Sequence, residues 1–168
     1  MNKESNKTSN YDLTIIVPIY NEIESLPALG EKLAKFIPTS KVKTAILLVN
    51  DGSSDGSGNA IKDLCQQEQH FYFIDLAKNS GLSAALKAGF DVVGSPLVGY
   101  IDADLQTAPE DFNLLLEYTK DYQLVTGVRA NRKDTFFKKL QSKIANSFRR
   151  SMTKDGATDT GCPLKIMH

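Results

Sequence analysis

The chain has 168 residues, of which 41% are hydrophobic and 24% are charged, and it contains two cysteines. No apolar run reaches the ~18 residues of a membrane-spanning helix, and no signal peptide opens the chain, which predicts a soluble cytoplasmic domain with reduced cysteines. Its 20 basic and 20 acidic residues cancel, but residues 1–128 carry a net charge of −7 and residues 129–168 one of +7.

From residue 13 onward, short β-rich apolar segments alternate with longer amphipathic segments, a pattern typical of an α/β protein with a mostly parallel sheet. A further short apolar run follows residue 163 and predicts one more strand. Ligands of such sheets bind beyond the carboxyl ends of the strands, so the residues after each strand are the first candidates for a site. The predicted strands span 13–19, 44–50, 71–76, 97–102 and 123–128, and the predicted helices span 23–36, 55–69, 82–93 and 109–120.

The first two strands are followed by polar segments. Residues 18–22 (PIYNE) contain an aromatic ring that could pack against a planar base, although an ordinary turn with Glu22 at the positive end of a helix would explain them equally. Residues 49–57 (VNDGSSDGS) carry acceptors suited to ribose hydroxyls or a base edge, and the alternative is a turn in which Asp55 caps the next helix.

After the third predicted strand, residues 78–89 (KNSGLSAALKAG) open a helix that is rich in small side chains. Close packing of this helix on the sheet would by itself explain that composition. The helix N-terminus could also support an anion.

The fourth predicted strand ends in residues 100–106 (YIDADLQ), which place Asp102 and Asp104 two residues apart after an apolar run. Neighbouring carboxylates repel one another unless a cation neutralises them. A hard divalent ion, Mg²⁺ or Mn²⁺, prefers such oxygen ligands and can bridge a diphosphate. The alternative is a solvated turn before the helix predicted at 109–120.

Taken in order, these segments resemble the family 2 glycosyltransferases of the GT-A fold, a Rossmann-like nucleotide-binding architecture. Within that family, the chain is most similar to the polyprenyl-phosphate glycosyltransferases, which include dolichyl-phosphate mannose synthases and undecaprenyl-phosphate sugar transferases. The resemblance covers about residues 12–166, and relatives continue further, which implies a C-terminally truncated chain. The matching segments are residues 18–22, 50–56 (NDGSSDG), 79–81 (NSG), 102–106 (DADLQ) with Pro109, 127–129 (GVR) and 159–162 (DTGC).

The resemblance implies specific roles for these residues. Asp104 and Gln106, with Asp102, would hold the metal ion, and Arg129 would contact a diphosphate or the acceptor phosphate. Asn50 departs from the Asp-Asp pair common in this loop and leaves Asp51 as the matching residue. The residues implied in nucleotide-sugar binding are Pro18, Tyr20, Glu22, Val49, Asp51, Asp102, Ala103 and Asp104.

The implied reaction moves a sugar from a UDP- or GDP-linked donor to a polyprenyl phosphate, with a metal ion and with inversion at the sugar carbon. A phosphate acceptor is already an anion and needs no strong general base. An acceptor hydroxyl of a saccharide, the alternative, would need one, and Asp159 is the candidate. The catalytic residues implied are therefore Asp104, Arg129 and Asp159.

Residues 129–154 contain nine basic side chains and one acidic side chain, with apolar residues at mostly four-residue intervals. This pattern predicts an amphipathic helix that could lie on an anionic membrane, where each basic group adds ~1 kcal/mol. Packing of the same apolar stripe on the domain is the alternative. Nucleic-acid binding is not expected, because no aromatic stacking platform accompanies the basic residues.

We therefore divide the chain into a disordered tail (1–11), a nucleotide-sugar and metal-binding core (12–128) and a basic acceptor- and membrane-side segment (129–168). The basic segment would lie at the cytoplasmic face of a membrane. Two other functions stay open. One is a nucleotide-sugar-binding fragment without turnover, and the other is a sugar nucleotidyltransferase, which the missing Gly-rich, Lys/Arg-bearing loop after the first strand disfavours. The sequence does not specify the oligomeric state.

Overall fold

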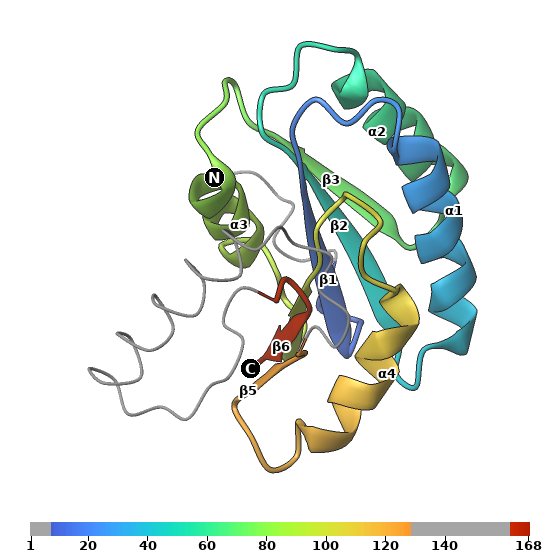
Figure 1. Cartoon of the computed structure of the whole chain (residues 1–168), viewed down its shortest axis with the longest axis vertical. Coiled ribbons are helices and arrows are strands. Elements are labelled where there is room, and N and C mark those ends of the chain that lie inside the picture. The colour runs from blue at the N-terminus through green and yellow to red at the C-terminus, as the bar shows by residue number, and fades with distance from the viewer. Residues whose placement is uncertain (1–7, 129–161) are drawn as a thin grey trace, which may run out of the picture.

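A six-stranded sheet forms the centre of the computed structural model, which describes residues 8–128 and 162–168 (Figure 1). Four of its strands run parallel in the order β3-β2-β1-β4, and β6 and β5 complete the sheet beside β4. The strands are β1 (Leu13–Ile19), β2 (Thr44–Asn50), β3 (Phe71–Asp75), β4 (Leu97–Tyr100), β5 (Leu124–Thr126) and β6 (Lys165–Met167).

The two central strands are buried on both faces. Every residue of β2 and all but one of β1 are buried, as expected for parallel strands that helices cover on both sides. Their register runs from Leu13 opposite Thr44 to Ile19 opposite Asn50. Both strands therefore end at the same edge of the sheet.

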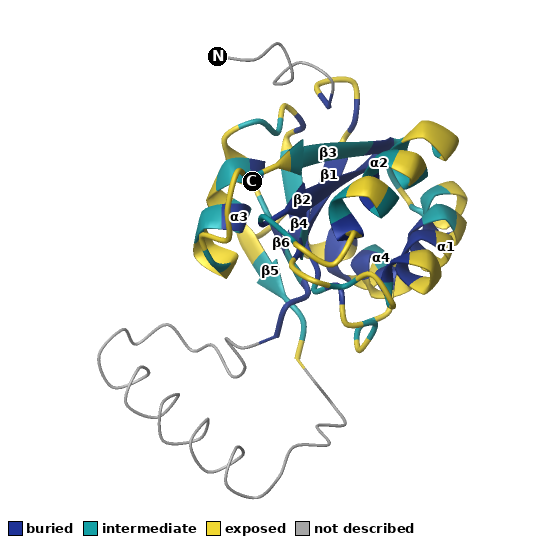
Figure 2. Cartoon of the chain, turned by 90° about the horizontal axis from the view of Figure 1, so that it is seen from above, coloured by how far each residue is buried: buried dark blue, intermediate teal, exposed yellow. Residues whose placement is uncertain are grey.

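Helices cover the two faces unequally. Three helices lie on one face and α3 lies on the other, with the buried residues concentrated between helices and sheet (Figures 1 and 2). Within the described ranges, no helix is long and apolar enough to cross a bilayer. The helices are α1 (Leu26–Phe36), α2 (Ser57–Gln67), α3 (Leu82–Phe90) and α4 (Phe112–Leu115), with 3-10 turns at Ile37–Thr39, Pro109–Asp111 and Leu116–Tyr118.

The structure confirms the α/β fold with a mostly parallel sheet, but it changes the predicted strand order beyond β4. Strand β5 runs parallel to β4, as the helix predicted between them implies, but β6 lies between β4 and β5 and is antiparallel to both. Strand β4 also ends at Tyr100 rather than at Asp102, because the backbone leaves the sheet before the acidic residues. The strand predicted after residue 163 is thus present as β6.

All four helices are shorter than predicted, and in two of them side chains bind backbone groups within the predicted range. Helix α1 begins at Leu26 rather than at residue 23, with Ser25 as its N-cap residue and a proline in its first turn, and the amide of Ile23 is bound by Asp55 from another loop at 3.0 Å. The helix predicted at 109–120 is broken into short turns. There the hydroxyl of Thr119 donates to the carbonyl of Leu116 at 2.9 Å, an alternative to continued helix.

Residues 8–11 fall within the segment predicted as a disordered tail, yet they pack against the domain. Thr8 and Tyr11 are buried, and the Tyr11 hydroxyl lies 3.0 Å from Nδ1 of His70 and 3.1 Å from the Tyr72 hydroxyl. Residues 8–11 therefore belong to the folded domain.

We predict that Phe112→Ala lowers the free energy of unfolding by about 3–5 kcal/mol, because Phe112 is fully buried and packs against Phe36 at a ring separation of 6.2 Å. Urea denaturation measures the change. The control is Leu114→Ala two residues away, where the side chain is 59% exposed and a change below about 0.5 kcal/mol is expected. Equal effects of the two substitutions would contradict this packing.

Candidate functional site

The carboxyl ends of β1, β2 and β3 meet at one edge of the sheet. Their register places Ile19, Asn50 and Asp75 side by side as the last residues of these strands. Strand β4 pairs with β1 up to Ile16 opposite Tyr100, so the chain that carries the acidic pair leaves the sheet beside the same edge. All four polar segments identified in the sequence are therefore gathered there.

The carboxylate of Asp51 joins the loop after β2 to the loop after β3. Asp51 is 3% exposed, and its two oxygens accept hydrogen bonds from the backbone amides of Ser80 and Gly81, each at 2.8 Å. A buried carboxylate is tolerated when its charge is compensated in this way. The carboxylate thereby fixes the start of α3 relative to the second loop.

Gly52 makes this close approach possible. Its φ of +65° lies in the left-handed region, and a Cβ at this position would lie 2.3 Å from the carbonyl carbon of Lys78. Both the conformation and the space therefore require glycine. The loops after β2 and β3 are in direct backbone contact at this point.

A second set of bonds joins the loop after β2 to the loop after β1. Asn21 has a φ of +54°. Its side-chain oxygen accepts a hydrogen bond from the backbone amide of Ser54 at 2.8 Å, and its backbone amide donates to the Ser53 hydroxyl at 3.0 Å. Asp55 Oδ2 accepts the amide of Ile23 at 3.0 Å. The three loops after β1, β2 and β3 are thus held together in series.

Asp55 also organises the start of α2, although it is not the residue that caps the helix. The N-cap residue is Gly56, and Asp55 Oδ1 accepts the amide of Ser57 at 2.9 Å and its hydroxyl at 2.6 Å. These bonds, of which the one from the hydroxyl contributes most, lower the pKa of Asp55. The Ser57 hydroxyl in turn accepts the amide of Glu22 at 3.0 Å.

The hydrogen bonds of Asn50 explain why an amide stands where the family pattern has a carboxylate. Its side-chain amide donates to Oδ1 of Asp75 at 2.9 Å, and its oxygen accepts the amide of Ser53 at 3.1 Å. The Lys62 ammonium lies 2.8 Å from the other oxygen of Asp75. Burial opposes ionisation of Asp75, but the hydrogen bonds from Lys62 and Asn50 outweigh it and lower the pKa. A carboxylate at position 50 would face the carboxylate of Asp75.

The acidic pair lies in the turn that follows β4. Asp104 is exposed, and its Oδ1 accepts the amide of Gln106 at 3.1 Å across Leu105, whose φ is +60°. Asp102 is half-buried, and its Oδ1 accepts a hydrogen bond from the hydroxyl of Tyr100. Burial first, and then the bond to Asp102, raise the pKa of Tyr100 far above its ordinary value, so the hydroxyl stays protonated.

The donor set of this turn fits a hard divalent ion. Asp102, Asp104 and Gln106 offer carboxylate and amide oxygens, the ligands that Mg²⁺ and Mn²⁺ prefer. Within the described ranges, no group of three or more His, Cys, Asp or Glu side chains could hold a metal by itself. Two carboxylates suit Mg²⁺, which usually keeps waters and takes further ligands from substrate phosphates.

The remaining candidates differ in accessibility. Tyr20 is 47% exposed and offers a ring face, Pro18 and Glu22 are half-buried, and Ala103 is buried. Val49 is fully buried in the core cluster on the α3 side of the sheet, so only its main chain could reach a ligand. Arg129, Asp159 and the basic segment 129–154 lie outside the described residues.

Sequence reasoning placed Tyr100, Asn21, Ser80 and Gly81 in the polar segments of this edge but assigned none of them an individual role. Tyr100 precedes Asp102 by two residues, and residues two apart in extended backbone share a face. That spacing could have identified Tyr100. The partners of Asp51 carry no signal in the sequence, because main-chain amides are present at almost every position.

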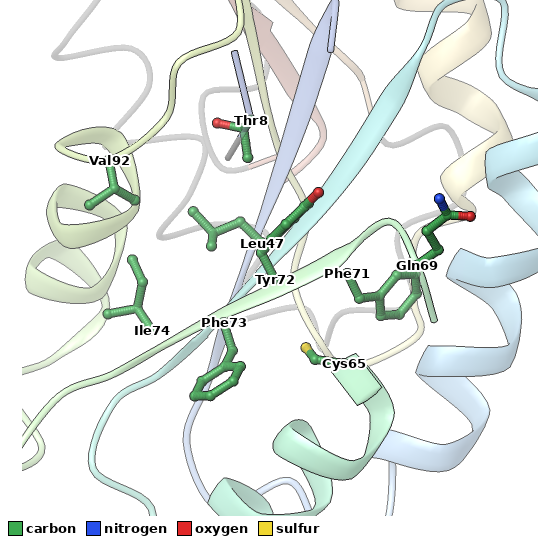
Figure 3. Close-up of a pocket in the computed structure, with 9 residues that line it drawn as sticks. All are labelled: Thr8, Leu47, Cys65, Gln69, Phe71, Tyr72, Phe73, Ile74 and Val92. Carbon is green, nitrogen blue, oxygen red and sulfur yellow. The ribbon is translucent and has the colours of Figure 1, made fainter. Parts of the chain in front are cut away.

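A separate cavity of about 310 Å³ lies along β3, the edge strand of the sheet (Figure 3). Leu47, Tyr72 and Ile74 line it from the α3 side, and Phe71 and Phe73 line it from the other side. It contains none of the predicted site residues. The cavity thus follows the outer strand of the sheet and is distinct from the carboxyl edge.

Residues 14–167 match the profile of Glycosyl transferase family 2. The undecaprenyl-phosphate 4-deoxy-4-formamido-L-arabinose transferase of Pectobacterium carotovorum is 38% identical over 156 residues, which are 92% of this chain and 48% of that protein. The transferase of the same name from Photorhabdus laumondii is 37% identical over 155 residues, 91% of this chain and 48% of its own. The chain thus spans about half the length of these relatives.

Solved structures share the fold. A mannosyltransferase from Pyrobaculum calidifontis, in complex with GDP-Man and Mn²⁺, has a TM-score of 0.66 at 22% identity and covers 94% of this chain and 44% of its own. Glucosyl-3-phosphoglycerate synthase from Mycobacterium tuberculosis, in complex with UDP, has a TM-score of 0.68 at 14% identity, and the match covers 95% of this chain and 57% of that protein. These similarities confirm the predicted GT-A fold.

We predict that Asn50→Asp lowers the free energy of unfolding by about 1–3 kcal/mol, because it replaces a part-buried amide–carboxylate bond with two facing carboxylates. Urea denaturation at neutral pH measures the loss. It should shrink as the pH falls through the carboxyl range, since protonation removes the repulsion.

Two variants control this experiment. Asp75→Asn, added to Asn50→Asp, restores an amide–carboxylate pair and should recover most of the lost stability. Asn59→Asp, at an exposed position on α2, makes the same chemical change and should have little effect. Failure of Asp75→Asn to rescue the variant would show that repulsion from Asp75 is not the cause.

Proposed function

Because this chain belongs to the family 2 glycosyltransferases, we propose that it transfers a sugar from a UDP- or GDP-linked donor to a polyprenyl phosphate, with a divalent metal ion and with inversion at the sugar carbon. The observation that carries the proposal is the gathering of four polar strand ends at one edge, with Asp102 and Asp104 beside it. The activity named for the relatives supports the choice of acceptor.

The ends of β1 and β2 and the loops that follow them form the proposed nucleotide pocket, with Pro18, Tyr20 and Glu22 on one side and Val49 and Asp51 on the other. The exposed ring of Tyr20 is free to stack on the base. The bonds from Asn21 and Asp51 to neighbouring loops hold this surface in place before the donor binds. Such preorganisation reduces the ordering cost of binding.

The turn after β4 holds the diphosphate side of the donor. Asp102, Asp104 and Gln106 would hold Mg²⁺ or Mn²⁺, and Ala103 would lie against the ribose. When bound, the ion supplies positive charge that stabilises the leaving diphosphate. Asp104, the more exposed carboxylate, is the side chain best placed to meet a ligand from solvent.

The acceptor phosphate provides its own nucleophile in the proposed reaction. One of its oxygens attacks the sugar carbon while the bond from that carbon to the diphosphate breaks, and the diphosphate leaves with the electron pair. Attack from the opposite side inverts the carbon. Arg129 would contact phosphate oxygens through its planar fork. With a saccharide hydroxyl as acceptor instead, Asp159 would have to accept the proton.

The basic segment 129–154 would bring the acceptor side to the cytoplasmic face of a membrane. Nine basic side chains and a four-residue apolar spacing support this proposal. We expect the protein to co-sediment with vesicles that contain anionic lipid and not with neutral vesicles, and binding should fall as salt is raised. Equal binding to both vesicle types would contradict it.

The central experiment is sugar transfer by Asp104→Ala. We expect the purified wild type to transfer radiolabelled sugar from a UDP- or GDP-sugar to polyprenyl phosphate with Mn²⁺. The variant should lose about 100-fold or more in Mn²⁺-dependent nucleotide affinity, since a metal contact contributes several kcal/mol and each 1.4 kcal/mol is tenfold. Calorimetry with Mn²⁺ and with EDTA measures this loss.

Asp63→Ala is the matched control, because it removes an exposed carboxylate from α2, away from the edge. It should change neither sugar transfer nor the Mn²⁺-dependent nucleotide affinity. Several outcomes would overturn the proposal. Unchanged Mn²⁺-dependent affinity in Asp104→Ala would refute the metal assignment. Transfer to a saccharide alone, nucleotide binding without turnover, or release of pyrophosphate would each replace the proposed reaction by one of the alternatives.

A further inference from the structure

Tyr100 is a buried tyrosine whose hydroxyl reaches a residue of the proposed metal site. It is 8% exposed, and the hydroxyl donates to Oδ1 of Asp102. Tyr100 is the last residue of β4, and Asp102 follows two positions later. In extended backbone such residues lie on the same face, which brings the hydroxyl to the carboxylate.

The sheet holds Tyr100 from both sides. It pairs with Ile16 on β1 and with Lys165 on β6, so β4 is an interior strand at this position. Asp102 lies beyond the end of the strand and is half-exposed. The hydrogen bond therefore joins the Asp102 carboxylate, beyond the strand end, to a tyrosine that is held within the sheet.

The two carboxylates of the turn are held differently. Asp104 accepts a bond from Gln106, a residue of its own turn. In the part of the chain that the structure describes, Tyr100 supplies the one hydrogen bond to the Asp102 carboxylate, through one of its two oxygens. None of the described residues donates a hydrogen bond to the other oxygen.

We infer that Tyr100 is a positioning residue, whose hydroxyl fixes the orientation of the Asp102 carboxylate for the metal–diphosphate part of the donor. The inference rests on the proposed function. Groups that orient metal ligands raise affinity because the ligand is ordered before the metal arrives, and their loss typically costs about 10–100-fold in affinity. Tyr100 does not itself contact the donor or the ion.

Tyr100→Phe tests the inference, since phenylalanine keeps the ring in its buried site and removes only the donor. Calorimetry with UDP and GDP, each with Mn²⁺ or with EDTA, should show Mn²⁺-dependent affinity weakened about 10-fold and metal-free affinity unchanged. A purely structural role would alter both affinities together. Urea denaturation establishes that the variant is folded.

The matched control is Tyr118→Phe, which removes a hydroxyl from a 54% exposed ring and should leave both affinities unchanged. A second test adds Tyr100→Phe to Asp102→Ala. If Tyr100 acts through Asp102, the added substitution should change Mn²⁺-dependent affinity less than about twofold, because the group that it positions is already gone. A further 10-fold loss would contradict action through Asp102.

The outcomes separate this inference from the proposed function. Absence of any Mn²⁺-dependent nucleotide binding in the wild type contradicts the proposed function and, with it, the role of Tyr100. Wild-type binding that Tyr100→Phe leaves unchanged contradicts the role of Tyr100 alone. A selective loss of the Mn²⁺-dependent affinity supports both.

Discussion

The buried carboxylate of Asp51 is the constraint on which the organisation of the carboxyl edge depends. A charged group with 3% exposure is stable only if its oxygens are satisfied, and the amides of Ser80 and Gly81 satisfy them. That requirement fixes the distance between the loops after β2 and β3, and Gly52 is the residue that tolerates it. With Asn21 joining the loop after β1, the edge behaves as one unit rather than as three independent loops.

Acidic residues at this edge fall into two groups. Asp51, Asp55 and Asp75 are each bound by backbone amides or by Asn50 and Lys62, so they stabilise the scaffold. Asp102 and Asp104 each accept one hydrogen bond within the described ranges and lie beyond the last residue of β4. Among these five aspartates, the two in the turn accept the fewest hydrogen bonds within the described ranges.

The sequence was sufficient for the elements whose signal is local. The bounds of β1 and β2 agree with prediction at every residue, because continuous apolar segments bounded by polar residues specify buried parallel strands. The strand ends named as a site also converge as expected. The place of β6 was missed, since three residues such as Lys165–Met167 contain no information about which gap in the sheet they fill. Leu105 adopts a left-handed conformation that its residue type does not predict, whereas asparagine, as at Asn21, adopts this conformation more readily.

The position of β6 beside β4 has a consequence for the order in which the sheet is completed. Strand β4 exposes an unpaired edge until Lys165–Met167 arrives, and the pairing of Tyr100 with Lys165 spans much of the chain. Strand β6 follows all the other strands in the sequence, so it is the last of them to be synthesised. During synthesis, β1, β2 and β3 can assemble while the turn that carries Asp102 and Asp104 still lacks one of its supports. The acidic turn would therefore be the last part of the edge to reach its final geometry, and until then an open strand edge would be exposed to other chains.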